Sequence, residues 1–135
     1  MPPADDEKVV PLVPPAAQGG RQFAPLQRFS AACQILLDMD GRLDIATALV
    51  FAVVAAAGGP ISGREIGRKA GTSTSATNRH LLTLEAGSGA VGQRAKGLGL
   101  IKSAQSPFDG RAKLYSLTPT GERLAHRLAN TLAPN

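Results

Sequence analysis

The chain has 135 residues, of which 43% are hydrophobic and only 4% aromatic, and it carries a formal net charge of +5. This length supports one compact domain and is too short to argue for two. A single cysteine, Cys33, excludes an internal disulfide and a four-cysteine zinc site. The longest apolar stretch, residues 45–57, is shorter than the roughly 20 residues of a membrane span. We therefore expect a soluble cytoplasmic protein without a membrane partner.

The positive charge is concentrated in the second half of the chain. Residues 1–59 hold four basic and six acidic side chains, whereas residues 60–135 hold eleven basic and four acidic ones, a net charge of +7. A basic region suits a polyanionic partner, because each neutralised phosphate releases condensed counterions. Charge alone does not identify such a partner, so a scaffold that binds nucleic acid is also required.

The first half of the chain is predicted to hold a tail and two helices. The proline-rich residues 1–22 are expected to be a disordered tail, and residues 23–135 to form one domain. Apolar residues at helical spacing predict a helix from Phe23 to about Gly41. Asp44 is the expected N-cap of a second helix that ends near residue 57. Because this second helix is apolar on all sides, we expect it at the centre of the core.

Residues 62–86 are predicted to form a helix-turn-helix. Ser62 and Glu65 form a capping box at the start of a short helix, which Gly71 ends in a left-handed conformation. Ser73 can then cap a second helix whose apolar face includes Leu81. Two short helices joined by a four-residue turn are typical of this DNA-binding motif.

The remainder is predicted to be a hairpin between a loop and a final helix. The glycine-rich residues 87–99 are expected to be a flexible loop, and residues 100–117 a β-hairpin with Pro and Asp-Gly turn residues. Thr118 and Pro119 begin a helix that reaches about residue 132. The predicted fold is mostly α with a small β-hairpin: a winged helix-turn-helix with extra N-terminal and C-terminal helices.

The sequence also resembles a known family. Residues 61–67, 71–79 and 109–121 resemble the multiple-antibiotic-resistance regulators, the MarR family. The last stretch is the most specific, with an Asp-x-Arg turn, a strand and a Leu-Thr-x-x-Gly helix start. The resemblance implies a transcription regulator whose recognition helix enters the major groove while a wing arginine enters the minor groove. By position, the implied DNA contacts are Thr74, Ser75, Asn78, Arg79 and, at the wing tip, Arg111.

The side-chain types at these positions suit DNA independently of the resemblance. Asn can pair with adenine and Arg with guanine in the major groove, while Ser and Thr can contact phosphates or bases. A cation at a hairpin tip suits a narrow minor groove, although Arg111 could also pair with Asp109. The predicted DNA-binding residues are Arg64, Ser73, Thr74, Ser75, Asn78, Arg79, Lys102, Arg111 and Lys113.

Other chemistries have weaker support in the sequence. Residues 87–92 match G-x-G-x-x-G, but a dinucleotide site requires a strand before this motif and a helix after it. His80 and His126 have no partner at metal-ligand spacing, and no nucleophile lies near a base in sequence. We therefore expect no cofactor, no metal and no enzymatic activity.

The favoured function is a sequence-specific regulator of transcription that binds double-stranded DNA and is associated with the nucleoid. Its N-terminal and C-terminal helices would either form a homodimer interface or pack on each other in a monomer. Two alternatives remain open, because a fold does not fix a function. One is a winged-helix module that binds a polymerase or an assembly partner, and the other is a DNA-binding replication or packaging factor.

Overall fold

The computed structural model describes residues 21–85 and 97–134. The predicted tail, residues 1–22, and the predicted loop, residues 87–99, therefore lie largely outside the described residues. The mostly α fold with a small antiparallel sheet is confirmed. Its elements are α3 (Ala24–Met39), α4 (Ile45–Ala57), β2 (Ile61–Ser62), α5 (Gly63–Ala70), α6 (Thr74–Leu84), β3 (Ile101–Gln105), β4 (Lys113–Leu117) and α7 (Pro119–Leu132).

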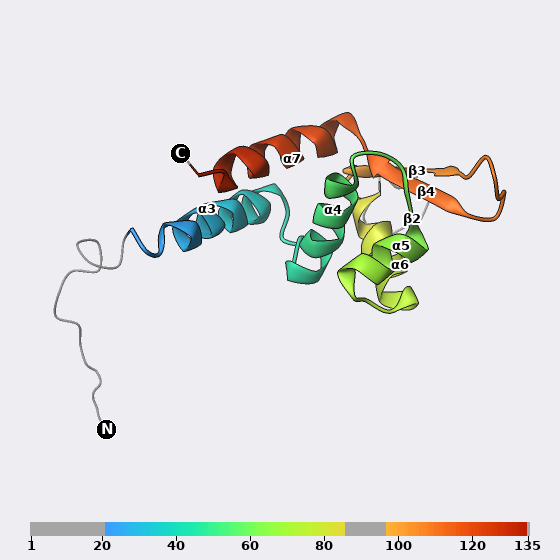
Figure 1. The fold of residues 1–135 in the computed structure, drawn as a ribbon, viewed down its shortest axis with the longest axis horizontal. Coiled ribbons are helices and arrows are strands. Elements are labelled where there is room, and N and C mark those ends of the chain that lie inside the picture. Colours follow the sequence, from blue (N-terminus) through green and yellow to red (C-terminus); the bar gives the residue numbers. More distant parts are fainter. Residues whose placement is uncertain (1–20, 86–96, 135) are drawn as a thin grey trace, which may run out of the picture.

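Helix α4 lies at the centre of the arrangement (Figure 1). On one side of it, α3 and α7 pack against each other, although they come from opposite ends of the sequence. On its other side, α4 contacts α5 and α6, which form the helix-turn-helix. The hairpin of β3 and β4 extends beyond the helices as a wing. The fold therefore places the pair α5 and α6 beside the wing and away from the pair α3 and α7.

Each of the four predicted N-caps forms its hydrogen bond. Asp44 accepts from the Thr47 amide at 2.8 Å, and Ser62 accepts from Glu65 at 3.1 Å. Ser73 and Thr118 cap α6 and α7 in the same way. Such caps satisfy amides that have no partner inside the helix, and each contributes about 1 kcal/mol. Short polar residues therefore fix where these helices begin.

The sheet contains a third strand that the sequence did not predict. The order is β2-β4-β3, with Ile61 opposite Tyr115 and Ser62 opposite Leu114. Ser62 is thus both the end of β2 and the N-cap of α5. The reciprocal half of the predicted capping box does not form, because the Glu65 carboxylate bonds Arg68 instead. Strand β2 joins the wing directly to the helix-turn-helix.

The prediction for α4 was only half right. Its buried side includes Val50, Phe51 and Val54, each at most 2% exposed, at the centre of the core. The opposite side is open, since Ile45 is 84% exposed and Leu49 is 42% exposed. Periodicity alone cannot separate a helix that is covered on all sides from one with an uncovered apolar face.

Candidate nucleic-acid interface

The turn between α5 and α6 is held by short hydrogen bonds. Gly71 adopts φ 72°, a left-handed conformation that glycine tolerates best, and its amide donates to the Gly67 carbonyl at 2.8 Å. The buried Thr77 hydroxyl donates to the Ser73 carbonyl at 2.7 Å and lies 2.6 Å from the Thr72 hydroxyl. These contacts fix the start of α6 relative to α5.

Helix α6 has one buried face and one exposed polar face. Thr77, His80, Leu81 and Leu84 are buried against the rest of the domain. The polar residues at the start and on the outer side of the helix are all exposed: Ser73, Thr74, Ser75, Asn78 and Arg79. Ser73 also uses its hydroxyl to accept from the Ala76 amide at 3.1 Å. The exposed face carries side chains of the types that contact base edges and phosphates in DNA-binding proteins.

The inner face of α6 is anchored to α4 through a buried hydrogen bond. His80 Nδ1 lies 3.0 Å from the hydroxyl of Thr47, and the two residues are 8% and 3% exposed. Asp44 accepts from Thr47 as well, and the Thr47 amide holds the pKa of the Asp44 carboxyl below its usual value. His80 is therefore a structural residue of the recognition helix.

Helix α5 adds basic side chains next to α6. Arg64, predicted as a phosphate contact, is exposed on the first turn. Arg68 and Lys69 are also exposed. The sequence reasoning missed them, although they follow Arg64 by four and five residues in the same predicted helix. The Arg68 guanidinium bonds Glu65, which lowers the pKa of Glu65 and raises that of Arg68. Arg64 and Lys69 add positive charge beside the recognition helix.

Two of the three predicted basic residues of the wing lie in or beside its turn. They are Arg111 and Lys113. Arg111 is exposed at the hairpin turn, where its amide donates to Asp109 Oδ1 at 3.0 Å. Within residues 21–85 and 97–134, no ion pair joins the guanidinium of Arg111 to Asp109. Lys113 is exposed two residue pairs beyond the Ser103–Tyr115 pair, and therefore on the same sheet face. Asp109 thus orders the backbone and leaves the arginine side chain in solvent.

Lys102 lies on the other sheet face. Its register partner is Ser116, so its side chain alternates with those of Ser103 and Tyr115. It also lines a groove between α3, α4 and α7 that is formed mainly by apolar side chains. The structure therefore separates Lys102 from the other predicted DNA-binding residues.

The wing is tied to the end of α6 by a polar junction. The Ser103 hydroxyl donates to Glu85 Oε2 at 2.5 Å, and the Leu100 amide donates to the Leu84 carbonyl at 2.9 Å. Burial raises the pKa of the nearby Tyr115 phenol, and the negative charge of Glu85 raises it further. This junction holds the base of the hairpin against the C-terminal end of α6.

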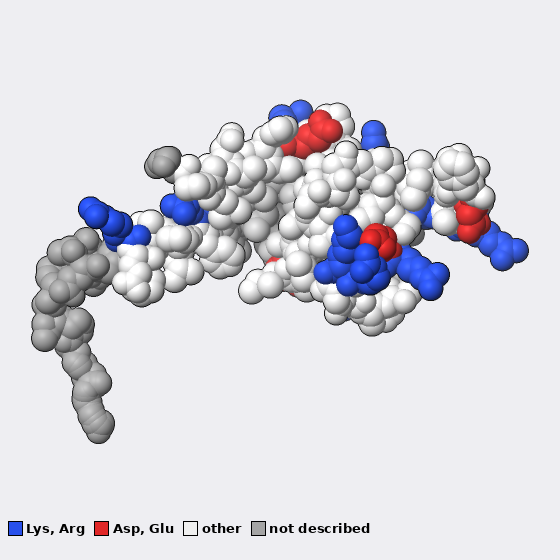
Figure 2. All heavy atoms as spheres, viewed as in Figure 1, with Lys and Arg blue, Asp and Glu red and all other residues white. Residues whose placement is uncertain are grey.

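Figure 2 shows how the basic side chains are distributed on one face of the molecule. Lys and Arg gather over the helix-turn-helix, and others lie at the wing tip on the same face. In this view, acidic atoms lie within the cluster over the helix-turn-helix and beside the basic atoms of the wing tip, and basic atoms cover the larger area of the cluster. Such a surface creates the positive potential that attracts a nucleic-acid backbone. We call this surface, carried by α5, α6 and the wing turn, the basic face.

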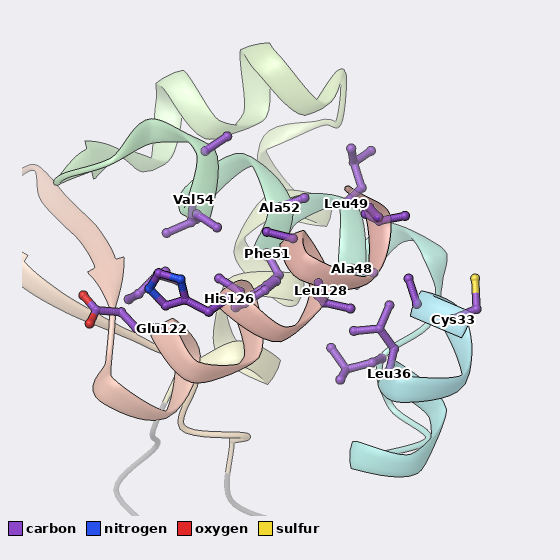
Figure 3. A pocket seen from close by; sticks show the side chains of 18 of the residues that line it. Cys33, Leu36, Ala48, Leu49, Phe51, Ala52, Val54, Glu122, His126 and Leu128 are labelled. Atoms are coloured by element: carbon purple, nitrogen blue, oxygen red, sulfur yellow. The ribbon is translucent and has the colours of Figure 1, made fainter. Parts of the chain in front are cut away.

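A second surface feature is an apolar groove between α3, α4 and α7. Figure 3 shows Leu36, Leu49 and Leu128, from these three helices, around one space. The volume of this space is about 1360 Å³. Cys33 and His126 lie at its border. The sequence reasoning missed this groove, although the completely apolar α4 was a signal for it. We call it the apolar groove.

Residues 21–85 and 97–134 hold no cluster of three or more His, Cys, Asp or Glu side chains arranged to bind a metal ion. In the same residues, no helix combines the length and apolarity that crossing a bilayer requires.

Known structures with the same arrangement are transcriptional regulators. The PcaV regulator of Streptomyces coelicolor, in complex with its natural ligand, is 23% identical, with a TM-score of 0.53 over 91% of this chain and 78% of that one. A mutant of MarR from E. coli in complex with operator DNA is 14% identical, with a TM-score of 0.52 over 90% and 80%. The apo form of wild-type MarR is 17% identical, with a TM-score of 0.51 over 93% and 79%.

The chain has the winged-helix fold of these regulators. At such low identity, the likeness establishes the fold and leaves the function to be argued from the site. No family model matches the sequence, and no curated protein matches it as a relative. The winged-helix architecture therefore confirms the resemblance to the MarR family at the level of the fold.

Proposed function

We propose that this winged-helix protein is a regulator of transcription that binds double-stranded DNA through its basic face. The observations that carry the proposal are the exposed polar side of α6, with Asn78 and Arg79, and the exposed Arg111 in the turn of the wing. Figure 2 shows basic side chains over the helix-turn-helix and at the wing tip on one face of the molecule. In this arrangement, α6 enters the major groove and the hairpin reaches the adjacent minor groove.

The other predicted residues fall into two groups, of which only the first belongs to the proposed interface. We assign phosphate contacts on either side of α6 to the exposed residues Arg64 and Lys113, together with Ser73, Thr74 and Ser75. Phosphate contacts position the protein, whereas Asn78 and Arg79 supply base recognition. Lys102 stands apart on the opposite face of the wing, so it does not belong to this interface.

The structural neighbours support this proposal. The PcaV protein of Streptomyces coelicolor is a transcriptional regulator, and a mutant MarR from E. coli was solved in complex with operator DNA. A chain with this fold can therefore bind DNA.

We infer further that the protein acts as a homodimer through α3 and α7. These helices lie side by side at the end opposite the wing (Figure 1). They expose large apolar side chains, among them Phe23 at 51%, Leu26 at 60% and Phe29 at 56%. A second copy related by two-fold symmetry would cover these residues and present two recognition helices to neighbouring half-sites. Light scattering after gel filtration would measure the predicted dimer mass.

The direct test is an electrophoretic mobility shift with random duplex DNA between about 50 and 200 mM salt. Each phosphate contact should add about 0.9 to the negative slope of log affinity against log salt. Arg79→Ala should weaken binding to a preferred duplex by about 1–3 kcal/mol. Lys102→Ala is the matched control, because Lys102 is exposed on the opposite face of the wing and its replacement removes the same charge.

The result also separates this function from that of a protein-interaction module. Such a module would bind duplex DNA only weakly, and Arg79→Ala and Lys102→Ala would then have equal effects. Equal effects of the two substitutions would therefore contradict the proposal. A replication or packaging factor would bind DNA as well, and the genomic positions of its binding sites would distinguish it from a regulator.

A further inference from the structure

Phe108 is the most exposed large hydrophobic residue of the described chain, with 96% of its surface in solvent. It lies in the turn of the hairpin between β3 and β4, at the part of the wing farthest from the helices (Figure 1). Single apolar residues are common on protein surfaces, so exposure alone assigns no role to Phe108. Its surroundings in the turn provide the further argument.

The turn is ordered by hydrogen bonds that do not involve the Phe108 side chain. The Ser106 hydroxyl accepts from the amides of Phe108 at 3.1 Å and Asp109 at 3.3 Å. The Ser106 amide donates to the Ala112 carbonyl at 2.9 Å, and the Ala112 amide donates to Asp109 at 3.0 Å. The backbone at the tip is thus held by polar contacts. The aromatic ring is presented to solvent rather than used to build the turn.

The same turn carries Arg111, three residues after Phe108. Its amide is bonded to Asp109, so the phenylalanine and the arginine are attached to one ordered stretch of backbone. Proteins that enter the minor groove combine these two side-chain types. An arginine is attracted by the negative potential of the groove, and an apolar side chain packs against the sugars or wedges between base steps.

We propose that Phe108 is a second minor-groove contact of the wing, placed beside Arg111. This inference rests on the proposed DNA-binding function and adds a side chain that recognises shape rather than charge. The ring packs on deoxyribose or against a partly unstacked base step, so sequences whose steps open easily are bound best. The ordered turn lowers the entropic cost of placing the ring.

The test uses Phe108→Ala and Phe108→Leu in the full chain. The probe is the duplex recovered by selecting bound sequences from a random pool, labelled at both ends to report bending. We expect Phe108→Ala to weaken binding roughly fivefold or more and to reduce the bend, and Phe108→Leu to retain part of both effects. Because the side chain is exposed, the thermal midpoint should not change. Ile45→Ala is the control, because it removes an exposed apolar side chain at the start of α4, outside the wing and outside the proposed α3 and α7 interface.

The outcomes separate this inference from the proposed function. Wild-type binding without salt dependence or sequence preference would overturn both. Strong wild-type binding, with Phe108→Ala equal to wild type in affinity and bend, would overturn only the role of Phe108. That second result would leave the exposed ring available to a protein partner. A loss of affinity in Ile45→Ala equal to that in Phe108→Ala would also count against a specific contact at the wing.

Discussion

Replacing Gly67 by alanine tests the close packing of the two helices in the helix-turn-helix. A Cβ atom at this position would lie 2.9 Å from the Thr77 hydroxyl oxygen and 3.4 Å from the Thr72 carbonyl oxygen. Thr77 cannot move aside easily, because its hydroxyl is bonded to the Ser73 carbonyl and to the Thr72 hydroxyl. The added methyl group would therefore push α5 and α6 apart.

The size of the effect follows from two opposing terms. Forcing an extra methyl group into a packed interface costs about 1–3 kcal/mol. Alanine in place of glycine within a helix regains about 0.5–1 kcal/mol. We therefore expect Gly67→Ala to lower the free energy of unfolding by about 0.5–2 kcal/mol. DNA affinity should fall as well, because basic residues of α5 and base-reading residues of α6 would no longer fit one duplex.

Urea unfolding followed by circular dichroism measures the first effect, and the mobility shift measures the second. Gly63→Ala is the control in the same helix, since its Cβ would meet Tyr115 at an ordinary 3.5 Å. Thr77→Ala removes the obstructing hydroxyl, so Gly67→Ala should cost less in that background than in the wild type. A neutral or stabilising Gly67→Ala, or an equal cost in both backgrounds, would refute the packing argument.

Three other changes test the polar contacts of the domain. Thr47→Val should cost about 1–3 kcal/mol in urea unfolding, because it leaves the buried His80 nitrogen without its partner, whereas Thr47→Ser should cost less. Ser103→Ala should weaken DNA binding more than it lowers stability, because it frees the wing from Glu85; an effect on stability alone would contradict this. The Asp44 pKa is lowered by the Thr47 amide, so its stabilisation is complete above the usual value of 3.8 and is lost as the pH falls through the lower folded value. Asp44→Asn keeps the cap without the titration, so its unfolding free energy should fall less between about pH 5 and pH 2 than that of the wild type.

Much of the fold could be predicted because local chemistry determines it. Ser62, Ser73 and Thr118 are short polar residues just before helical periodicity, and each caps the predicted helix. Gly71 adopts the left-handed conformation that a helix end requires. In each case the signal and its structural consequence lie within four residues of each other, so no tertiary information was needed.

The features that were missed depend on contacts between distant residues. Ile61 and Ser62 form a strand only because Leu114 and Tyr115 lie beside them, and a two-residue strand carries no periodicity. The exposed side of α4 depends on how α3 and α7 are placed, which the apolar pattern of α4 does not contain. Lys102 appeared equivalent to Lys113 until the sheet register put them on opposite faces. Their separation follows from strand pairing rather than from composition.

The central claim is that α6 and the wing contact two grooves of the same duplex. Dimethyl sulfate methylates guanine N7 in the major groove and adenine N3 in the minor groove, so methylation interference on a selected duplex reports both contacts at once. We predict guanine interference that Arg79→Ala weakens, flanked by adenine interference that Arg111→Ala removes. Binding that neither modification disturbs, or that both substitutions leave unchanged, would contradict the account.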